Sequence, residues 1–267
     1  MIVDYHMHLR RPAPVAEEPE HTVEAVERYA EVAAARGVDE IGISEHVYYF
    51  IETSGVWTVP YQRERCTRSL DDYCDTVLEA KRRGLPVKLA LEVDWVPERA
   101  GDLAEILAPY PWDYVLGSVH WIDGVAVDQQ PGLWAGHTVA EVWDRYVREL
   151  TAAALSGHFD VLAHPDLAKV FGDKFAYDWT LAVASWEHVC VEISTAGLHK
   201  PVRELYPDPQ LLRLARASDT PITLASDAHA AEDVGRDFDQ AVELARDAGY
   251  DTVTVFDRRR RRQEPLG

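Results

Sequence analysis

The sequence predicts an α/β protein in which parallel strands alternate with helices and close into a barrel. Strand-like apolar runs and helix-like amphipathic segments alternate along all 267 residues, and strands separated by helices form parallel sheets with right-handed crossovers. Seven or eight such units in one chain favour a closed barrel over an open sheet. No glycine- or serine-rich linker interrupts the alternation, so we expect a single domain over residues 1–267.

Extended segments are predicted from short apolar runs bounded by turn residues. They are Ile2–Tyr5, Glu40–Ser44, Val87–Val93, Asp113–Ser118, Val161–Ala163, Cys190–Ser194, Pro221–Ala225 and Thr252–Phe256. Helices are predicted between them from capping residues, such as Thr22 and the T-x-x-E pair of Thr138 and Glu141. The helices span Val23–Arg36, Ser69–Gly84, Asp102–Leu107, Thr138–Gly157, Leu181–His188, a segment that begins at Asp208-Pro209, and Glu232–Ala248.

Two long stretches, Val47–Arg68 and Trp121–Gly136, show little periodicity. The first is rich in aromatic residues and follows a strand end, where loops often cover an active site. A surface loop that packs its own aromatic side chains fits the pattern equally well, and the sequence leaves both interpretations open.

Composition restricts the classes of partner. A formal net charge of −19 argues against binding to a nucleic-acid backbone, and the short basic run Arg258–Arg262 is interpreted as a solvated tail. The three cysteines have no metal-binding or redox spacing and are interpreted as reduced thiols of a cytoplasmic protein. No signal peptide is visible, and no apolar run approaches the ~20 residues that a membrane helix needs.

Metal-ligating residue types follow one predicted strand after another. His6 and His8 lie two positions apart, so on a strand they share one face. Five later apolar runs also end in such residues, which gives the set His6, His8, His46, Glu92, His120, His164, Asp227 and His229. In α/β barrels the C-terminal ends of the strands form one face, and we expect the eight side chains to meet there.

Eight ligands are too many for one tetrahedral ion, and they suit two or three. An imidazole-rich set favours Zn, Fe or Mn over Mg, and Glu92, in the middle of the set, is a candidate bridge between ions. Such clusters activate a bound water and clamp the oxygens of a phosphate ester. Each residue taken alone is explained as well by a structural role, such as a buried histidine bonded to a carbonyl; only the repetition favours a metal cluster.

These motifs, in this order, resemble those of the polymerase and histidinol phosphatase (PHP) superfamily. The matching segments are His6-x-His8, Ser44-Glu45-His46, Glu92, Gly117-Ser118-Val119-His120, Ala163-His164-Pro165-Asp166 and Ser226-Asp227-Ala228-His229. The resemblance covers nearly the whole chain. Within it, Ile193–Pro201, followed by Glu204 and Tyr206-Pro207, resembles the segment typical of the PHP-type histidinol phosphatases.

The resemblance implies a distorted (β/α)7 TIM-like barrel with Thr252–Phe256 outside the ring, and it implies three metal ions. By matching motifs, the first ion is held by His6, His8, Glu92 and Asp227, the second by Glu92, His120 and His164, and the third by His46 and His229.

The sequence departs from the family pattern at two places. Family members usually carry a further histidine soon after the His-x-His pair, but here position 14 is Pro and the loop Arg10–Glu20 is longer. We expect His21 to supply this ligand to the third ion, with Glu17 and Glu20 as alternatives. Ser194 stands where the family more often has Asn.

The expected activity is that of a metal-dependent phosphomonoesterase acting on L-histidinol phosphate in histidine biosynthesis. Glu92, His120, Asp227 and His229 are the expected catalytic residues, and Lys200, Lys169 and Ser194 are candidates for contact with the substrate, although both lysines fit ordinary solvated positions equally well. Two alternatives stay open: a phosphoesterase for another small monoester or nucleotide, and a non-catalytic metal-binding module. The partner is expected to be a small phosphomonoester, with neither nucleic acid nor membrane involved; the sequence does not fix the oligomeric state.

Overall fold

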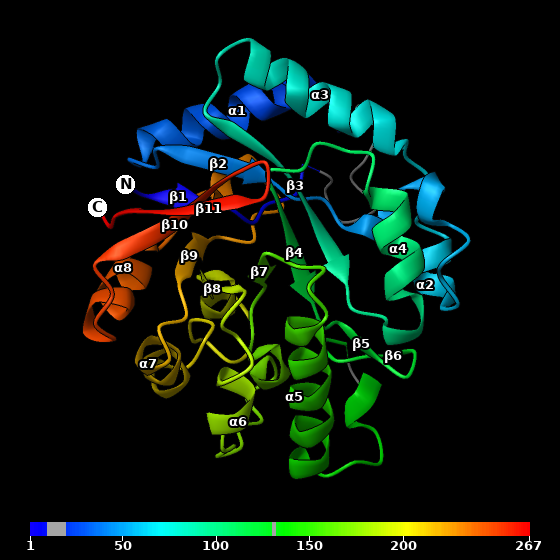
Figure 1. Cartoon of the computed structure of the whole chain (residues 1–267), viewed down its shortest axis with the longest axis vertical. Coiled ribbons are helices and arrows are strands. Elements are labelled where there is room, and N and C mark those ends of the chain that lie inside the picture. Colours follow the sequence, from blue (N-terminus) through cyan, green and yellow to red (C-terminus); the bar gives the residue numbers. More distant parts are fainter. Residues whose placement is uncertain (10–19, 130–131) are drawn as a thin grey trace.

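Seven parallel strands form the centre of the molecule and curve into a barrel (Figure 1). The structure is a computed structural model that describes residues 1–9, 20–129 and 132–267. The strand order is β1-β2-β3-β4-β7-β8-β9. These strands span Val3–Asp4, Glu40–Ile43, Val87–Asp94, Tyr114–Ser118, Val161–Leu162, Cys190–Ser194 and Ile222–Ala225, respectively.

The first and last strands of this sheet meet, which closes the ring. The amide of Tyr5 donates to the carbonyl of Leu224 at 3.0 Å, and the amide of His8 donates to the carbonyl of Ala228 at 2.7 Å. The predicted TIM-like α/β barrel is therefore confirmed. The longest strand, β3, pairs with β2 from Val87 onward and with β4 from Ala90 onward, so it crosses the barrel wall obliquely.

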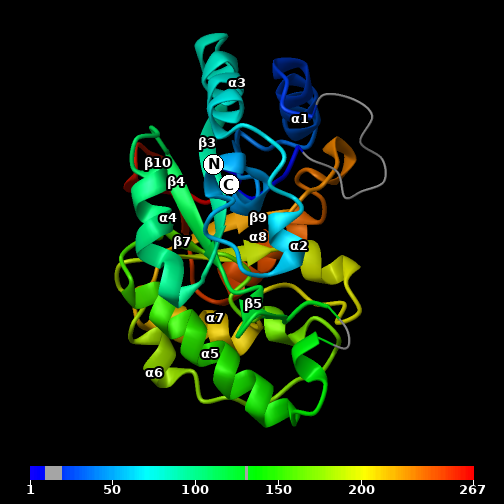
Figure 2. The same ribbon diagram turned by 90° about the vertical axis from the view of Figure 1, so that its right-hand side faces the viewer.

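Helices surround the barrel on its outer side (Figures 1 and 2). They are α1 (Val23–Ala35), α2 (Pro60–Arg63), α3 (Leu70–Arg82), α4 (Ala100–Leu107), α5 (Val139–Leu155), α6 (Thr180–Val183), α7 (Pro209–Ala217) and α8 (Phe238–Asp247). The predicted caps are present: Thr22 accepts from the amide of Ala25, and Thr138 and Glu141 form a reciprocal capping box. Among the described residues, no helix is both long and apolar enough to cross a bilayer.

Two predicted helices are shorter than expected. The helix expected over Leu181–His188 is only α6, because the hydroxyl of Ser185 donates to the carbonyl of Ala182 and competes with the helical pattern. The helix expected over Glu232–Ala248 begins only at Phe238. Its first part turns at Gly235, whose amide donates to the buried carboxylate of Asp4 at 2.8 Å.

The two irregular stretches contain short elements. The first holds the 3-10 turns Val47–Tyr49 and Ile51–Thr53 and helix α2, and the second holds a small hairpin, β5 (Trp121–Ile122) with β6 (Val125–Ala126), and the 3-10 turn Gly132–Trp134.

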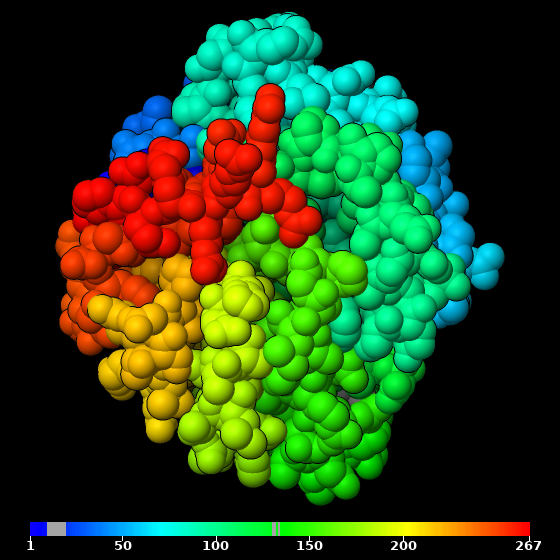
Figure 3. Space-filling view, in the orientation of Figure 1, coloured from blue at the N-terminus to red at the C-terminus, as the bar shows by residue number. Residues whose placement is uncertain are grey.

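The C-terminal segment forms a hairpin outside the ring, β10 (Thr252–Asp257) with β11 (Arg260–Pro265). The basic run is therefore not a free tail, which corrects the sequence-based interpretation. The amide of Arg259 donates to the carbonyl of Asp113, and its guanidinium donates to Asp160 at 2.8 Å. Because both partners directly precede barrel strands, the hairpin lies across the strand-start end of the barrel. In the space-filling view it extends from the left edge of that face to its centre (Figure 3).

Aromatic side chains fill this end of the barrel. The rings of Tyr5 and Tyr114 stack at 4.9 Å, and Phe256 of the hairpin packs 5.2 Å from Tyr114. The hydroxyl of Tyr114 donates to the carbonyl of Tyr5 at 2.6 Å. A β-carbon added at Gly42 would lie only 1.7 Å from that hydroxyl oxygen, so Tyr114 occupies the space that a side chain at position 42 would need.

We therefore expect Gly42→Ala to lower the free energy of unfolding by about 2 kcal/mol, the typical cost of overpacking a core. The penalty should be smaller in a Tyr114→Phe background, since that change removes the clashing oxygen. Urea unfolding of the four proteins in this double-mutant cycle measures the coupling. Equal penalties in both backgrounds would show that Tyr114 is not the obstacle.

Candidate metal centre

All eight ligands expected from strand ends lie together at the C-terminal end of the barrel. Their nitrogen and oxygen atoms form four overlapping groups, and within each group the atoms lie within 4.8 Å of one another. The groups are His6, His8 and Asp227; His6, Glu92 and His164; His46, Glu92 and His120; and His8, His46 and His229. The structure therefore brings every one of these side chains into one cluster.

Glu92 occupies the centre of the cluster. Its Oε2 lies 2.6 Å from Nδ1 of His46 and 3.3 Å from Nε2 of His6. Its Oε1 faces the other way, 3.3 Å from Nε2 of His164 and 3.5 Å from Nε2 of His120. The two oxygens of one carboxylate thus face two different sets of imidazoles, which is the arrangement a bridging ligand requires.

Several polar atoms of the cluster are buried without a hydrogen-bond partner among the described residues. They are Nε2 of His6, Nε2 of His8, Nδ1 of His46 and Oε2 of Glu92. Leaving such atoms unsatisfied costs on the order of 1–3 kcal/mol each. Lone pairs of imidazole and carboxylate that converge at this distance fit a transition-metal ion, whose coordination would satisfy them.

A cavity of about 480 Å³ opens above the cluster. Glu92, His120, His164, Asp227 and His229 form part of its lining. Tyr48, Tyr49 and Tyr61 line it as well. The aromatic stretch after β2 therefore covers the site, as the first of the two interpretations of this stretch predicts. The cavity is large enough for a small organic phosphate, and its inner end is the cluster itself.

Comparison with known proteins identifies the family. The sequence model of the PHP domain matches residues 19–196, which include His46, Glu92, His120 and His164. The chain belongs to the PHP domain family.

Relatives of this chain match it over most of its length. It is 30% identical to a probable histidinol-phosphatase of Deinococcus radiodurans over 254 residues, which are 92% of this chain and 94% of that protein. It is 23% identical to a histidinol-phosphatase of Lactococcus lactis subsp. lactis, over 95% of this chain and 94% of that protein. In fold it is similar to the solved histidinol phosphate phosphatase of Lactococcus lactis complexed with Zn, L-histidinol and phosphate, with a TM-score of 0.73, 20% identity and 98% of both chains covered.

Charges in the cluster keep its carboxylates ionised. Burial disfavours the charged forms, but the neighbouring imidazoles outweigh burial and hold the pKa values of Glu92 and Asp227 well below their usual range. In His120, burial is outweighed by the negative charges of Glu92, Asp94 and Asp128, which raise its pKa to about 10.

His46 and His229 are neutral instead. Burial lowers their pKa values to about 3 and about 4, and the charge of Lys200 is among the influences that lower the value for His229. A neutral imidazole is the form that binds metal, whereas a protonated ring such as that of His120 releases its proton when metal binds.

Further buried carboxylates contact the cluster histidines on the side of the ring that faces away from the cluster. Glu192 accepts at Oε2 from Nδ1 of His6, 2.8 Å away, and at Oε1 from the amide of His164, 3.1 Å away. Asp94 lies 2.7 Å from Nδ1 of His120. These contacts leave Nε2 of each ring facing the cluster, and such partners orient metal-binding histidines.

Sequence reasoning missed Glu192 and Asp94. The available signals were an acidic residue inside the apolar run Cys190–Ser194 and a second carboxylate two positions after Glu92.

His21 does not join the cluster, contrary to expectation. Its Nε2 lies 3.2 Å from Oε1 of Glu45, and Oε2 of Glu45 lies 3.7 Å from Nδ1 of His8. Glu45 therefore stands between His21 and the cluster. His21 was expected to join His46 and His229, but the third side chain of that group is His8. Of the alternatives, Glu20 pairs with Arg68, and Glu17 lies outside the described residues.

The three candidates for substrate contact are placed differently. Lys200 lines the cavity. Lys169 is buried, and its Nζ pairs with Asp166 at 2.8 Å and donates to the carbonyl of Leu205 at 2.7 Å. Ser194 is fully buried, and its hydroxyl oxygen accepts from the amide of Ala196 at 3.3 Å. Neither Lys169 nor Ser194 lines the cavity, so the geometry supports only Lys200 of the three.

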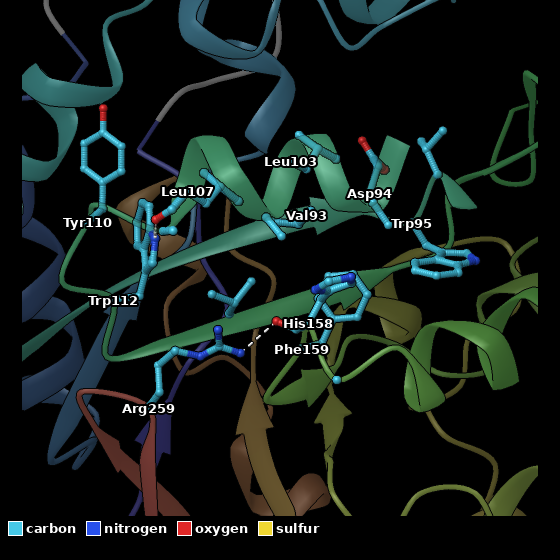
Figure 4. A pocket seen from close by; sticks show the side chains of 16 residues that line it. Val93, Asp94, Trp95, Leu103, Leu107, Tyr110, Trp112, His158, Phe159 and Arg259 are labelled. Atoms are coloured by element: carbon cyan, nitrogen blue, oxygen red, sulfur yellow. Dashed lines mark hydrogen bonds between the residues drawn. The ribbon is translucent and has the colours of Figure 1, made fainter. Parts of the chain in front are cut away.

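A second cavity, of about 190 Å³, lies between α4 and strands β3 and β4 (Figure 4). Trp95, Trp112 and Phe159 line it, and none of the eight cluster residues does. Its one cationic side chain, Arg259, is already bonded to Asp160 and to the carbonyl of His158. Asp94 lines this cavity while it also holds His120, so the carboxylate separates the apolar space from the cluster.

Metal removal is expected to destabilise the protein, because the buried atoms of the cluster then lose their partners and a ligand that binds only the folded state is withdrawn. Treatment with a strong chelator should lower Tm, and addition of Zn²⁺ should restore it; differential scanning calorimetry measures both steps. An unchanged Tm in a preparation shown to have lost its metal would contradict the assignment of a metal centre.

Glu192→Gln is expected to weaken metal binding about 10–100-fold, the usual effect of losing a partner of a metal-bound histidine. A glutamine amide presents one acceptor and one donor, so it cannot accept from both His6 and the amide of His164. Competition with a chromophoric chelator measures the affinity. Glu187→Gln is the matched control, since Glu187 precedes the same strand but its side chain is 73% exposed. Equal metal affinities in the two variants would show that Glu192 does not position His6.

Proposed function

We propose that this PHP domain is a metal-dependent phosphomonoesterase that hydrolyses L-histidinol phosphate to L-histidinol and phosphate. One observation carries the proposal: eight side chains of metal-ligating types, with Glu92 at their centre, lie together beneath an open cavity. The full-length similarity to a probable histidinol-phosphatase supports the choice of substrate. The reaction belongs to histidine biosynthesis, and the free thiols of Cys66, Cys74 and Cys190 are consistent with the cytoplasmic location that we infer.

We infer that three ions of Zn, Fe or Mn bind. His6, His8 and Asp227 would hold the first, and His120 and His164 the second, with Glu92 shared between them. His46 and His229 would hold the third, with His8 within reach. Bound ions of this kind lower the pKa of water to roughly 7 and stabilise negative charge on phosphoryl oxygens.

The chain's own residues perform the other tasks. Glu92 and Asp227 stay ionised and fix the separation of the imidazoles around them. His120 and His229 present ring nitrogens to the cavity. Among the residues that the structure describes, Lys200 is hydrogen-bonded only through its backbone, whose amide donates to the carbonyl of Gly197 at 3.1 Å. Its ammonium therefore lines the cavity as a point charge available for a phosphate oxygen. Tyr48, Tyr49 and Tyr61 form an aromatic part of the cavity wall.

The test is a comparison of kcat/KM for L-histidinol phosphate with the values for a panel of sugar phosphates and nucleotides. We expect L-histidinol phosphate to exceed the others by at least about 100-fold, a difference of ~2.7 kcal/mol in transition-state binding. Glu92→Gln is the control, and it should lose both activity and bound metal. Elemental analysis should find more than one ion per chain in the unaltered protein.

Better turnover of another monoester would replace the substrate while keeping the reaction class. Absence of turnover for every monoester, with metal bound, would favour the non-catalytic metal-binding module.

A further inference from the structure

Two carboxylates line the cavity that is proposed to bind a phosphate ester. Asp128 and Glu64 both belong to its wall, and neither carboxylate makes a hydrogen bond or ion pair with another residue that the structure describes. Both side chains are exposed to solvent. A phosphate monoester carries up to two negative charges at neutral pH, and like charges at close range repel it. Such side chains favour binding only when another part of the substrate is cationic.

The backbone at Asp128 is held firmly beside the cluster. The amide of Val127 donates to the carbonyl of His120 at 2.8 Å, and the indole of Trp134 donates to the carbonyl of Val127 at 3.0 Å. Asp128 therefore follows Val127, whose amide and carbonyl are both hydrogen-bonded. These bonds place the backbone next to Asp128 beside His120.

The charges in the cavity are segregated. Asp128 is close enough for its charge to act on His120, whereas the charge of Lys200 acts on His229. These two histidines come from different strands, β4 and β9, and belong to different metal-binding groups. The cavity therefore presents the cation of Lys200 on the His229 side and the anion of Asp128 on the His120 side. The guanidinium of Arg65, which lies 3.5 Å from the centre of the Tyr61 ring, adds a second cation to the wall.

Flat aromatic side chains lie near the anionic side. Trp121 directly follows His120, and its ring centre lies 5.4 Å from that of Tyr61. Tyr61 in turn lies 6.0 Å from Tyr48. These three rings line the cavity, and they offer stacking surfaces for a planar or apolar part of a leaving group.

From this arrangement we propose that Asp128 is the residue that selects substrates with an ammonium group close to the phosphate ester. The preferred substrates are aminoalkyl phosphates, in which the phosphoryl group binds at the cluster and the ammonium binds the Asp128 carboxylate. The inference rests on the proposed phosphomonoesterase activity and adds a cation-recognising residue to it. It needs no bond-making step beyond that hydrolysis.

The experiment compares two pairs of substrates that differ only in the ammonium group. The first pair is L-histidinol phosphate and its analogue with hydrogen in place of the amine, and the second is phosphoethanolamine and ethyl phosphate. In the unaltered protein we expect kcat/KM to favour the amine of each pair by about tenfold, the effect of ~1.4 kcal/mol from one charge-assisted contact. Asp128→Asn should reduce that preference to less than about twofold and leave the amine-free substrates nearly unchanged.

Two further variants make the result specific. Glu98→Gln removes one exposed negative charge outside this cavity, and it should leave the preference intact. Glu64→Gln removes the other carboxylate of the cavity wall. Loss of the preference in Glu64→Gln, with its retention in Asp128→Asn, would overturn the assignment to Asp128.

The remaining outcomes separate this inference from the proposed function. If Asp128→Asn slows amine-containing and amine-free substrates equally, the residue acts on the reaction in general and the selectivity proposal is wrong. If the unaltered protein does not prefer L-histidinol phosphate over the panel, the proposed substrate is wrong, yet phosphoethanolamine and ethyl phosphate still test Asp128. These conclusions about Asp128 require that Asp128→Asn keeps the metal content and the Tm of the unaltered protein.

Discussion

One buried carboxylate organises the metal centre. Glu92 directs Oε2 toward His6 and His46 and Oε1 toward His120 and His164, so imidazoles from four different strand ends meet at one side chain. Burying a carboxylate costs free energy unless hydrogen bonds or positive charges compensate for the lost water. Strand β3 places it correctly because it is the longest strand of the barrel and reaches the C-terminal face after pairing with β2 and then β4.

The backbone of the strand ends is adapted to this task. His164 and Asp227 adopt φ values of 27° and 51°, which residues other than glycine rarely do. The amide of His164 is held by Glu192, and the segment before Asp227 is held by Asp4, which accepts from the amide of Ser226 at 2.9 Å. Buried carboxylates thus support the site twice, by orienting imidazole rings and by fixing unusual backbone. Strain of this kind persists where the surrounding structure enforces it, and it is concentrated at functional sites.

The sequence predicted the features that repeat with a short period. Alternating strands and helices predicted the barrel, and residues at the ends of apolar runs predicted which eight side chains meet, because parallel strands bring their C-terminal ends to one face. What it could not predict depends on contacts between distant positions. Glu192 bonds to His6, 186 positions away, and no pattern in the sequence around Glu192 indicates that partner. The position of His21 depends on Glu45, 24 positions later, which occupies the space between it and the cluster. Likewise, the turn that splits the helix expected over Glu232–Ala248 is fixed by Asp4, from the opposite end of the chain.

The closure of the barrel also dictates when the site can exist during synthesis of the chain. Asp4 on the first strand bonds a residue 222 positions later, and Asp227, which shares a group with His6 and His8, follows the last strand of the ring. A nascent chain that has made only the first six strands of the ring therefore has Glu92 and Glu192 beside the His-x-His pair but lacks Asp227. Contacts this distant in sequence form late and slowly, because the loop entropy must be overcome first. The complete cluster, with Asp227 and His229, can consequently form only when the last strand of the ring joins the first.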